Sequence, residues 1–246
     1  MIHDLSRRST QSELMDTEPL SFAAFHAYLR DLALINVCTL AYRPTLHWLH
    51  RALRSGAAKH RVSIIDVGSG GGDMLRRLAA WAARHEIEAE LTGVDLNPWS
   101  KRSAEEAADG ASVRYETSDI FDFRPERRAD FIISSLFTHH LRDEEIIRFI
   151  RWMEQHAVRG WFINDLHRHP LPYHFIKYFT RLFGFDRMVQ NDAPLSVARA
   201  FVKADWQRLL AAAAIPPERV RVTWFFPFRY GIACRCSDER GGGTHT

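Results

Sequence analysis

The segment Ile64-Ile65-Asp66-Val67-Gly68-Ser69-Gly70-Gly71-Gly72-Asp73 decides the fold of this chain. An apolar strand is expected to end here and to be followed by a glycine-rich turn, where the backbone can approach a ligand closely. A helix is expected to begin at about Met74. In a doubly wound sheet, ligands bind outside the carboxyl ends of the strands, at a turn of this kind. The segment therefore predicts a ligand site at the first strand of an α/β domain.

Strand and helix patterns alternate after this segment. Short strands are expected at 62–67, 89–94, 112–115, 130–134 and 159–165, with helical patterns between them. This alternation predicts a parallel sheet with helices on both faces. Two more strands are expected at 220–224 and 230–234, and their short connection predicts an antiparallel hairpin. The expected fold is α/β: a doubly wound, mostly parallel seven-stranded sheet with an antiparallel C-terminal hairpin.

The remaining segments predict how the chain is organised around this sheet. Residues 1–20 are polar and mixed in charge, so we expect a flexible arm, and 21–56 are expected to form an N-terminal helical cap. The main domain is expected over 57–236, with a polar, glycine-rich tail at 237–246. Within the main domain, 166–205 is too long for an ordinary connection and is rich in aromatic residues. It predicts a helical insertion after strand five that acts as a substrate lid.

Composition excludes several classes of function. The net charge is only +3 and the arginines are scattered, which argues against nucleic-acid binding. The three cysteines lack the spacing of a disulfide framework. The N-terminus has no secretory signal, and no apolar run approaches the about 20 residues that cross a bilayer. We expect a cytoplasmic protein with a small-molecule substrate. Lys177, Arg181 and Arg187 allow at most peripheral membrane contact, and a homodimer is possible.

The glycine spacing distinguishes between ligands. A dinucleotide-binding turn follows Gly-x-Gly-x-x-Gly, but Asp73 occupies the last of these positions. An acid there would also repel a pyrophosphate at the start of the helix. The pattern that fits is Asp-x-Gly-x-Gly-x-Gly, formed by Asp66, Gly68, Gly70 and Gly72. A carboxylate just before the turn suits a ligand that carries an ammonium group.

Acidic residues follow the next two expected strands. Asp95 ends the second strand, where a carboxylate can accept hydrogen bonds from ribose hydroxyls. Asp119 follows the third strand and could accept a hydrogen bond from the amino group of adenine. Either acid alone could equally be a solvated loop residue. Together with the glycine turn, they predict an edge of the sheet that binds a nucleoside.

The order of these motifs resembles that of class I S-adenosylmethionine-dependent methyltransferases, over roughly residues 60–235. The resemblance implies S-adenosyl-L-methionine as the cofactor, a reversed hairpin at the end of the sheet, and methyl transfer as the reaction. It also implies which residues surround the cofactor: Asp66, Gly68, Ser69, Gly70, Gly72, Asp95, Leu96, Asp119, Ile120 and Ser135. A nicotinamide dehydrogenase and a non-catalytic protein that keeps the fold and binds the cofactor remain as alternatives.

Two shorter segments resemble particular branches of that family. Ser134-Ser135-Leu136-Phe137-Thr138-His139-His140-Leu141 resembles the segment after strand four in quinone-ring methyltransferases. Residues 164–170 and 191–196 are similar to methyltransferases found beside bacterial type III polyketide synthases, a setting in secondary metabolism. These likenesses imply O-methylation of a small, apolar, phenolic or polyketide-derived acceptor, with C-methylation of a quinol-like ring as the alternative. The segment after strand four lacks the Asn-Pro-Pro-Tyr signature of amide and adenine N-methyltransferases.

Histidines at the same edge of the sheet are candidates for a general base. A phenol has a pKa near about 10, so it needs a base at neutral pH. The candidates are His139 and His140 after strand four and His167 and His169 after strand five. We expect His139 or His167 to remove the proton, and the alternative is that these histidines are structural. His167, His169 and Asp165 could resemble a metal site, but acids do not cluster there, so we expect no metal.

Overall fold

The structure is a computed structural model and describes residues 4–54, 61–107 and 112–236. Its centre is a seven-stranded sheet with the order β3-β2-β1-β4-β5-β7-β6, in which β7 runs antiparallel to both β5 and β6. The predicted fold class is confirmed. The strands are β1 (Arg61–Val67), β2 (Glu88–Asp95), β3 (Val113–Thr117), β4 (Ala129–Ser135), β5 (Ala157–Leu166), β6 (Val220–Phe225) and β7 (Arg229–Arg235).

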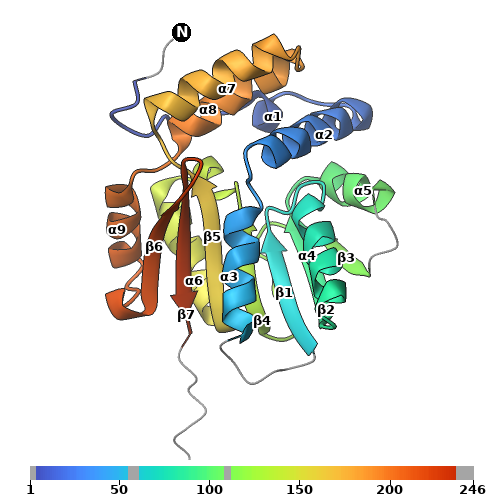
Figure 1. The fold of residues 1–246 in the computed structure, drawn as a ribbon, viewed down its shortest axis with the longest axis vertical. Helices are drawn as coiled ribbons and strands as arrows, with labels where there is room; N and C mark the ends of the chain where they lie inside the picture. The colour runs from blue at the N-terminus through green and yellow to red at the C-terminus, as the bar shows by residue number, and fades with distance from the viewer. Residues whose placement is uncertain (1–3, 55–60, 108–111, 237–246) are drawn as a thin grey trace, which may run out of the picture.

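Helices cover both faces of the sheet (Figure 1). They are α3 (Arg43–Arg54), α4 (Asp73–Arg84), α5 (Pro98–Glu106), α6 (Asp143–His156) and α9 (Lys203–Ala212), with short 3₁₀ turns η1 (Thr138–His140) and η2 (Pro217–Arg219). One core cluster joins α6 and α9 to the sheet through residues such as Phe149, Trp206 and Trp161. The other joins α3 and α4 to the opposite face through Leu49, Leu75 and Phe162. Burial of these large apolar side chains is the main force that holds the layers together.

A further helical layer lies over the carboxyl ends of the parallel strands (Figure 1). It consists of α2 (Phe22–Cys38), α7 (Pro170–Leu182) and α8 (Arg187–Arg199). These helices share their own apolar cluster, which includes Tyr28, Tyr173 and Val189. The insertion predicted after strand five therefore forms helices, and they pack onto the helical cap expected near the N-terminus. This layer forms a roof above the edge where the sequence places the ligand.

The segment before α2 differs from the flexible arm expected there. It contains the short helix α1 (Leu14–Thr17) and is fastened to α8. The buried carboxylate of Asp192 accepts hydrogen bonds from the backbone N–H groups of Leu14 at 2.8 Å and Met15 at 3.1 Å. Further back, Arg8 Nη1 donates to Asp143 Oδ1 at 2.6 Å. The segment is thus a packed part of the helical layer.

Some expectations lie outside the described residues. They are the tail at 237–246 and the boundary between cap and main domain at 56–57. Within the described residues, no helix has both the length and the apolar character needed to pass through a lipid bilayer.

Candidate active site

The glycine turn between β1 and α4 is shaped by backbone conformations that favour glycine. Gly68, Gly70 and Gly72 have positive φ angles of 71°, 50° and 72°. A Cβ atom on Gly68 would lie 2.6 Å from the ring of Phe137, so any side chain there would collide with the segment after β4. The turn is held against β2, because the backbone N–H groups of Gly68 and Ser69 both donate to the carbonyl of Val94. The exposed backbone of the turn is therefore fixed in one place.

Asp66 lies at the end of β1, directly before the turn, and is almost completely buried. Its Oδ1 atom has no hydrogen-bond partner in the described structure. Burial, followed by the nearby carboxylates of Asp73 and Asp95, raises the pKa of Asp66 well above its usual value. A buried carboxylate oxygen without a donor is costly, so a cationic donor placed here would be bound favourably.

Asp95 ends β2 and ties together three parts of the same edge. Its Oδ2 accepts from the backbone N–H of Gly70 at 2.8 Å, and its Oδ1 accepts from the Asn97 N–H at 2.9 Å and the Ser100 hydroxyl at 3.0 Å. Burial raises the pKa of Asp95, and these donors oppose the rise. A carboxylate can accept about four hydrogen bonds, so one position on Oδ2 remains free. From the sequence, we predicted that this side chain binds the ribose hydroxyls. In the structure it also holds the glycine turn in place.

The other residues predicted to contact the cofactor follow neighbouring strands. Leu96 is 69% exposed, and Ile120 is buried in the core. Asp119 is exposed, and its Oδ1 accepts from the backbone N–H of Phe121 at 2.9 Å, leaving Oδ2 available. Ser135, at the end of β4, lies with its hydroxyl 3.1 Å from that of Thr45 on α3. The carboxyl ends of four adjacent parallel strands thus supply all the predicted cofactor residues.

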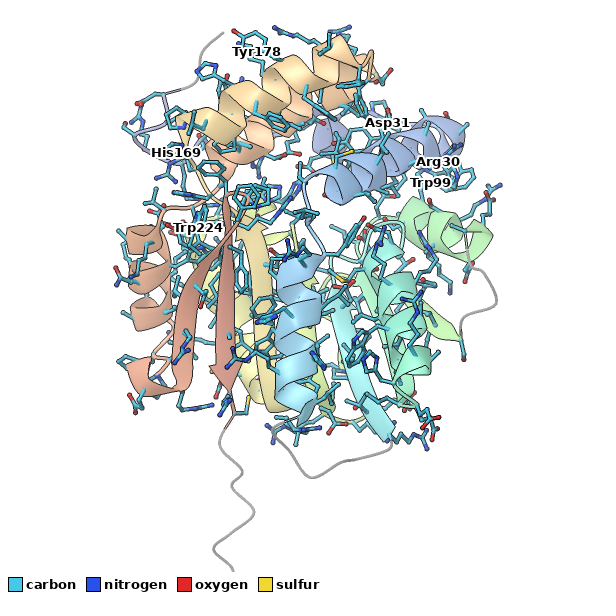
Figure 2. The ribbon with its side chains drawn as sticks, in the orientation of Figure 1. Arg30, Asp31, Trp99, His169, Tyr178 and Trp224 are labelled. Atoms are coloured by element: carbon cyan, nitrogen blue, oxygen red, sulfur yellow. The ribbon has the colours of Figure 1, made fainter. Side chains whose placement is uncertain are left out.

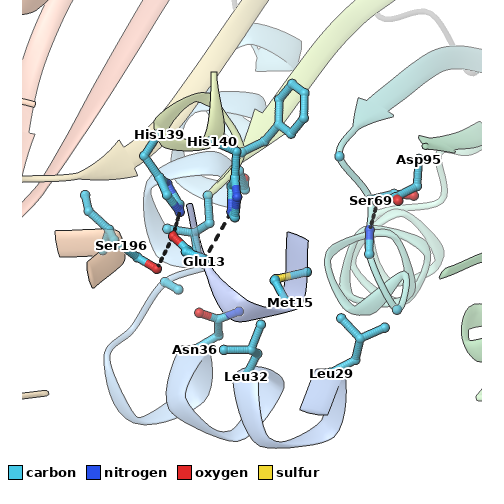
Figure 3. A pocket seen from close by; sticks show the side chains of 18 of the residues that line it. Glu13, Met15, Leu29, Leu32, Asn36, Ser69, Asp95, His139, His140 and Ser196 are labelled. Atoms are coloured by element: carbon cyan, nitrogen blue, oxygen red, sulfur yellow. Dashed lines mark hydrogen bonds and ion pairs between the residues drawn. The ribbon is translucent and has the colours of Figure 1, made fainter. Parts of the chain in front are cut away.

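A single cavity of about 1620 Å³ joins this edge to the helical layer (Figure 3). A ligand site for one small molecule is typically about 300–1000 Å³, so this cavity has room for a nucleoside cofactor and a second molecule. Of the predicted cofactor residues, the cavity is lined by Asp66, Gly68, Ser69, Gly70, Asp95, Leu96, Asp119, Ile120 and Ser135. Gly72 is not among the lining residues, and a Cβ atom added there would collide with the side chain of Tyr115.

His139 faces the same cavity from the side opposite the glycine turn (Figure 3). Its Nδ1 lies 2.7 Å from Oδ1 of Asp165, which is completely buried at the end of β5. Burial would raise the pKa of Asp165, but His139 together with the donors Thr138 and Leu166 lowers it to about 2. An ionised carboxylate only accepts hydrogen bonds, so Nδ1 carries the proton and Nε2 is left free to act as a base.

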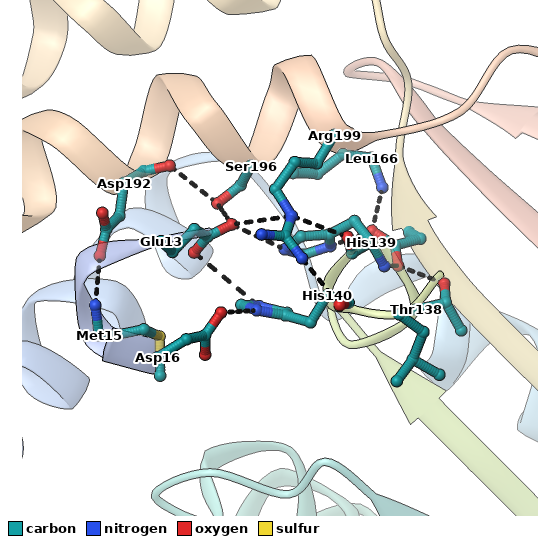
Figure 4. Close-up of polar contacts among 12 residues, drawn as sticks. Glu13, Met15, Asp16, Thr138, His139, His140, Leu166, Asp192, Ser196 and Arg199 are labelled. Atoms are coloured by element: carbon teal, nitrogen blue, oxygen red, sulfur yellow. Dashed lines mark hydrogen bonds and ion pairs between the residues drawn. The ribbon is translucent and has the colours of Figure 1, made fainter. Parts of the chain in front are cut away.

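Three residues from the N-terminal segment and η1 complete a charged cluster with His139 (Figure 4). Glu13 is buried, and its Oε1 lies 3.8 Å from His139 Nε2, while its Oε2 lies 3.9 Å from His140 Nε2. The His140 Nδ1 is 3.1 Å from an oxygen of Asp16. Burial would lower the pKa of His140, but the charge of Glu13 and the hydrogen bond and charge of Asp16 raise it to about 9. Glu13 and Asp16 were not proposed as site residues from the sequence, and His140 was only one of four candidate histidines.

Arg199, at the end of α8, binds this cluster to the roof (Figure 4). Its guanidinium donates to the backbone carbonyls of His139 at 2.9 Å, His140 at 2.8 Å and Gln11 at 2.6 Å. It also lies 3.9 Å from Oε1 of Glu13. One side chain therefore positions both η1 and the N-terminal segment.

Glu13, His139 and His140 each offer a possible metal-ligating atom, all within 4.8 Å of one another. Glu13 already has other partners, because Ser196 donates its hydroxyl to Oε1 at 2.9 Å and Arg199 lies close by. This group differs from the His167, His169 and Asp165 set considered from the sequence, since Asp165 is bonded to His139 instead.

His167, the second base predicted from the sequence, lies outside the cavity lining. Its Nδ1 faces the indole N–H of Trp224 at 3.2 Å, and its ring packs near those of His169, Phe228 and Tyr230. Burial, followed by the charges of His169 and Arg168, lowers the pKa of His167. The structure brings His139 to the predicted cofactor edge and places His167 on the other side of β5.

Comparison with known families decides what kind of domain this is. A family model described as a methyltransferase domain matches residues 64–160. The matched range begins within β1 and includes the glycine turn, Asp95, Asp119 and His139. Residues 64–160 therefore match a methyltransferase domain, and the sheet that contains them has the fold of class I methyltransferases. A comparison with curated proteins found no match to the sequence.

Solved methyltransferase structures share the fold of this domain. The plantazolicin methyltransferase BpumL, solved with S-adenosylhomocysteine, has a TM-score of 0.62 at 14% identity, with 88% of this chain and 89% of that one covered. A methyltransferase from Aquifex aeolicus has a TM-score of 0.61 at 17% identity, with 86% and 98% covered. Human N-acetylserotonin methyltransferase has a TM-score of 0.59 at 14% identity, with 88% and 57% covered. Since all identities are low, these structures establish the fold of the methyltransferase domain and leave its acceptor open.

Proposed function

We propose that the methyltransferase domain binds S-adenosylmethionine along the ends of β1, β2 and β3 and transfers its methyl group to a small, apolar, phenolic acceptor. The observation that carries this proposal is the single cavity that contains both the glycine turn and His139. The cofactor and the acceptor would then share one cavity, with a base beside the acceptor. C-methylation of a quinol-like ring is the alternative within the same cavity.

The residues at the strand ends fit the cofactor. The unpartnered Oδ1 of buried Asp66 suits the ammonium group of the methionine moiety. The positive φ angles of the glycine turn leave backbone without side chains where the methionine would lie. Asp95 has one acceptor position left for a ribose hydroxyl, and Asp119 Oδ2 and exposed Leu96 are available to adenine. Solved neighbours of this fold contain S-adenosylmethionine or its demethylated product, which supports this assignment.

When bound, S-adenosylmethionine would supply an electrophilic methyl carbon on a sulfonium. The task of the protein is then to place an acceptor oxygen in line and to remove its proton. We assign proton removal to Nε2 of His139, because Asp165 fixes the proton on Nδ1 and the ring faces the cavity. The carboxylate of Glu13, 3.8 Å from Nε2, would stabilise the imidazolium that results.

The walls of the cavity on the side of the helical layer suit an apolar acceptor. Leu29, Leu32 and Met15 face it from α2 and α1 (Figure 3). Ile176 and Val197 contribute from α7 and α8, which we assign as the substrate lid. A ring held among these side chains would be shielded from water, and this favours attack by a phenolate on a cationic sulfonium.

The test has two stages that separate the cofactor from the acceptor. Calorimetry should show micromolar binding of S-adenosylmethionine and S-adenosylhomocysteine to the purified protein. Phenols, resorcinols and quinols of increasing alkyl-chain length should then be screened for methyl acceptance, with mass spectrometry to locate the added methyl group. Absence of binding to either cofactor form would overturn the central claim, and methyl groups found only on ring carbons would select the C-methylation alternative.

A further inference from the structure

Helix α7 carries a stripe of large apolar side chains that no described part of the chain covers. Leu171, Phe175, Tyr178 and Leu182 are 63%, 55%, 63% and 80% exposed. Their spacing of four, three and four residues places them on one face of the helix. The opposite face is buried in the helical layer through Tyr173, Ile176 and Thr180. In Figure 2, Tyr178 points outward from α7 at the extreme end of the molecule.

The stripe continues to the cavity. Leu171 and Phe175 line the cavity while remaining exposed, as do Leu40 after α2 and Phe226 before β7. Three separate elements thus contribute exposed apolar side chains to the rim of one opening. Contiguous exposed apolar surface of this kind marks a site of interaction with another apolar phase or molecule.

Cations flank the apolar stripe. Lys177 and Arg181 lie together on one side of it, and Arg187 follows at the start of α8. Among the described residues, none of these three side chains is within salt-bridge distance of a carboxylate. Asp186 is the acid in this stretch, and it caps α8 through the backbone N–H of Met188. Lys177 Nζ lies over the ring of Tyr173, 5.8 Å from its centroid, and this contact leaves its charge without a counterion. An apolar face with such cations beside it is the arrangement that binds anionic lipid surfaces.

The size of the stripe argues against a second copy of the chain as its partner. Helix α7 has 13 residues, so it is about 20 Å long. At the exposed fractions given above, the four side chains of the stripe present on the order of 500 Å², which is less than the about 800 Å² that each partner of a stable interface contributes. A lipid surface has no such minimum, because it takes up single side chains into its headgroup and acyl region.

We propose that α7 docks on an anionic lipid membrane surface and opens the cavity toward it, so that apolar acceptors enter directly from the bilayer. The lipid contact is independent of the reaction, and only the nature of the entering molecule rests on the proposed function. Vesicle binding can therefore be measured without cofactor or acceptor, so its failure is distinguishable from a failure of methyl transfer.

The experiment is co-sedimentation with vesicles of phosphatidylcholine and phosphatidylglycerol. The double variant Tyr178→Ser, Leu182→Ser should bind at least tenfold more weakly than the wild type, and Arg181→Glu should also bind more weakly. Trp224→Ser, an exposed aromatic on β6, and Arg84→Glu, an exposed cation at the end of α4, are the matched controls and should bind like the wild type. Binding of S-adenosylmethionine by each variant checks that it is folded.

Three results would overturn the proposal. The first is a wild-type protein that sediments with neither anionic nor neutral vesicles, and the second is a double variant that binds as tightly as the wild type. The third is a stable wild-type dimer in solution that the double substitution dissociates, because this would make a second copy the occupant of the stripe.

Discussion

The glycine turn and the charged cluster around Glu13 lie on opposite sides of one cavity, and they are built in different ways (Figure 3). The turn, Asp66 and Asp95 come from two adjacent strands and depend on local backbone conformation. The cluster combines α1, η1, β5 and α8, which are up to 186 residues apart in sequence, counting from Glu13 to Arg199. Short sequence motifs determine the glycine turn, whereas the charged cluster forms only when the whole helical layer is folded. Substitutions should therefore separate cofactor binding from proton removal.

The largest effect is expected at the base. His139→Gln should lower kcat by about 10²- to 10⁴-fold, the usual contribution of a general base, while the Kd for S-adenosylmethionine stays unchanged. The physical reason is that the glutamine amide cannot take a proton from the acceptor. Steady-state kinetics and calorimetry on the same preparation make the comparison. His167→Gln is the matched control, and a larger loss of kcat there than at His139 would reverse our assignment of the base.

Asp95→Ala should instead affect cofactor binding. The change removes a carboxylate that holds Gly70 and offers an acceptor to the ribose, so we expect cofactor affinity to fall about 100-fold. Glu105→Ala on the adjacent α5 serves as the control, because that carboxylate is exposed and, within the described part of the chain, forms an ion pair with Lys101 alone. Calorimetric titration measures the effect, and unchanged affinity in Asp95→Ala would mean that the nucleoside binds elsewhere.

The same contrast explains which features could be predicted from the sequence. The succession of strands and helices along the chain, the hairpin and the turn followed from alternation and glycine spacing, because these patterns reflect local sterics and burial. His139 was a candidate because it follows β4, and parallel strands bring their carboxyl ends to one edge. His167 met the same criterion, and only the structure shows that it lies outside the cavity lining.

Glu13 is a site residue that could not be predicted from the sequence. It belongs to a polar segment with no periodicity, for which a flexible arm was the natural expectation. Its burial depends on Asp192 holding the start of α1, and on Ser196 and Arg199 one and two helical turns further along α8. Arg199 offered no signal either, since an arginine at the end of a helix is ordinarily solvated. Only the tertiary packing assigns these residues to the site.

Glu13→Gln should lower kcat by an intermediate amount, because it changes only the charged cluster. The amide can keep the hydrogen bond to Ser196 but loses the negative charge near His139 Nε2. We expect kcat to fall about tenfold, which corresponds to about 1.4 kcal/mol of lost stabilisation of the imidazolium. The pH–rate profile should shift to lower pH, because loss of this negative charge destabilises the protonated imidazolium and the neutral base then forms at lower pH.

A control for this variant comes from the same segment. Glu18→Gln changes an exposed carboxylate five residues later and should leave both kcat and the pH–rate profile as in the wild type. If the two variants behaved alike, the N-terminal segment would contribute through its fold and not through the charge of Glu13.

His140 should make the stability of this region depend on pH. Its pKa is raised to about 9 in the folded protein, against about 6.5 in the unfolded chain. Protonated His140 therefore stabilises the folded state. This stabilisation is fully present below about pH 6.5 and is lost as the pH rises through about 9. The wild-type Tm should therefore fall by a few degrees more than that of His140→Gln between pH 6 and 9.5. Parallel curves in thermal denaturation, with His85→Gln as control, would show that the pair with Asp16 contributes nothing.

The smallest effect is expected from chelators, and it concerns the same cluster. Glu13, His139 and His140 present ligand atoms within 4.8 Å of one another, which by itself would suit a divalent ion. Glu13, however, already accepts from Ser196 and lies beside the Arg199 guanidinium, and His139 is held by Asp165 as a base. An added cation would be repelled by Arg199 and would occupy the Nε2 that the reaction needs. Methyl transfer should thus be unchanged in excess EDTA, and addition of Zn²⁺ should inhibit it. Loss of activity on chelation, restored by a stoichiometric metal, would instead make the two histidines ligands and move proton removal to another group.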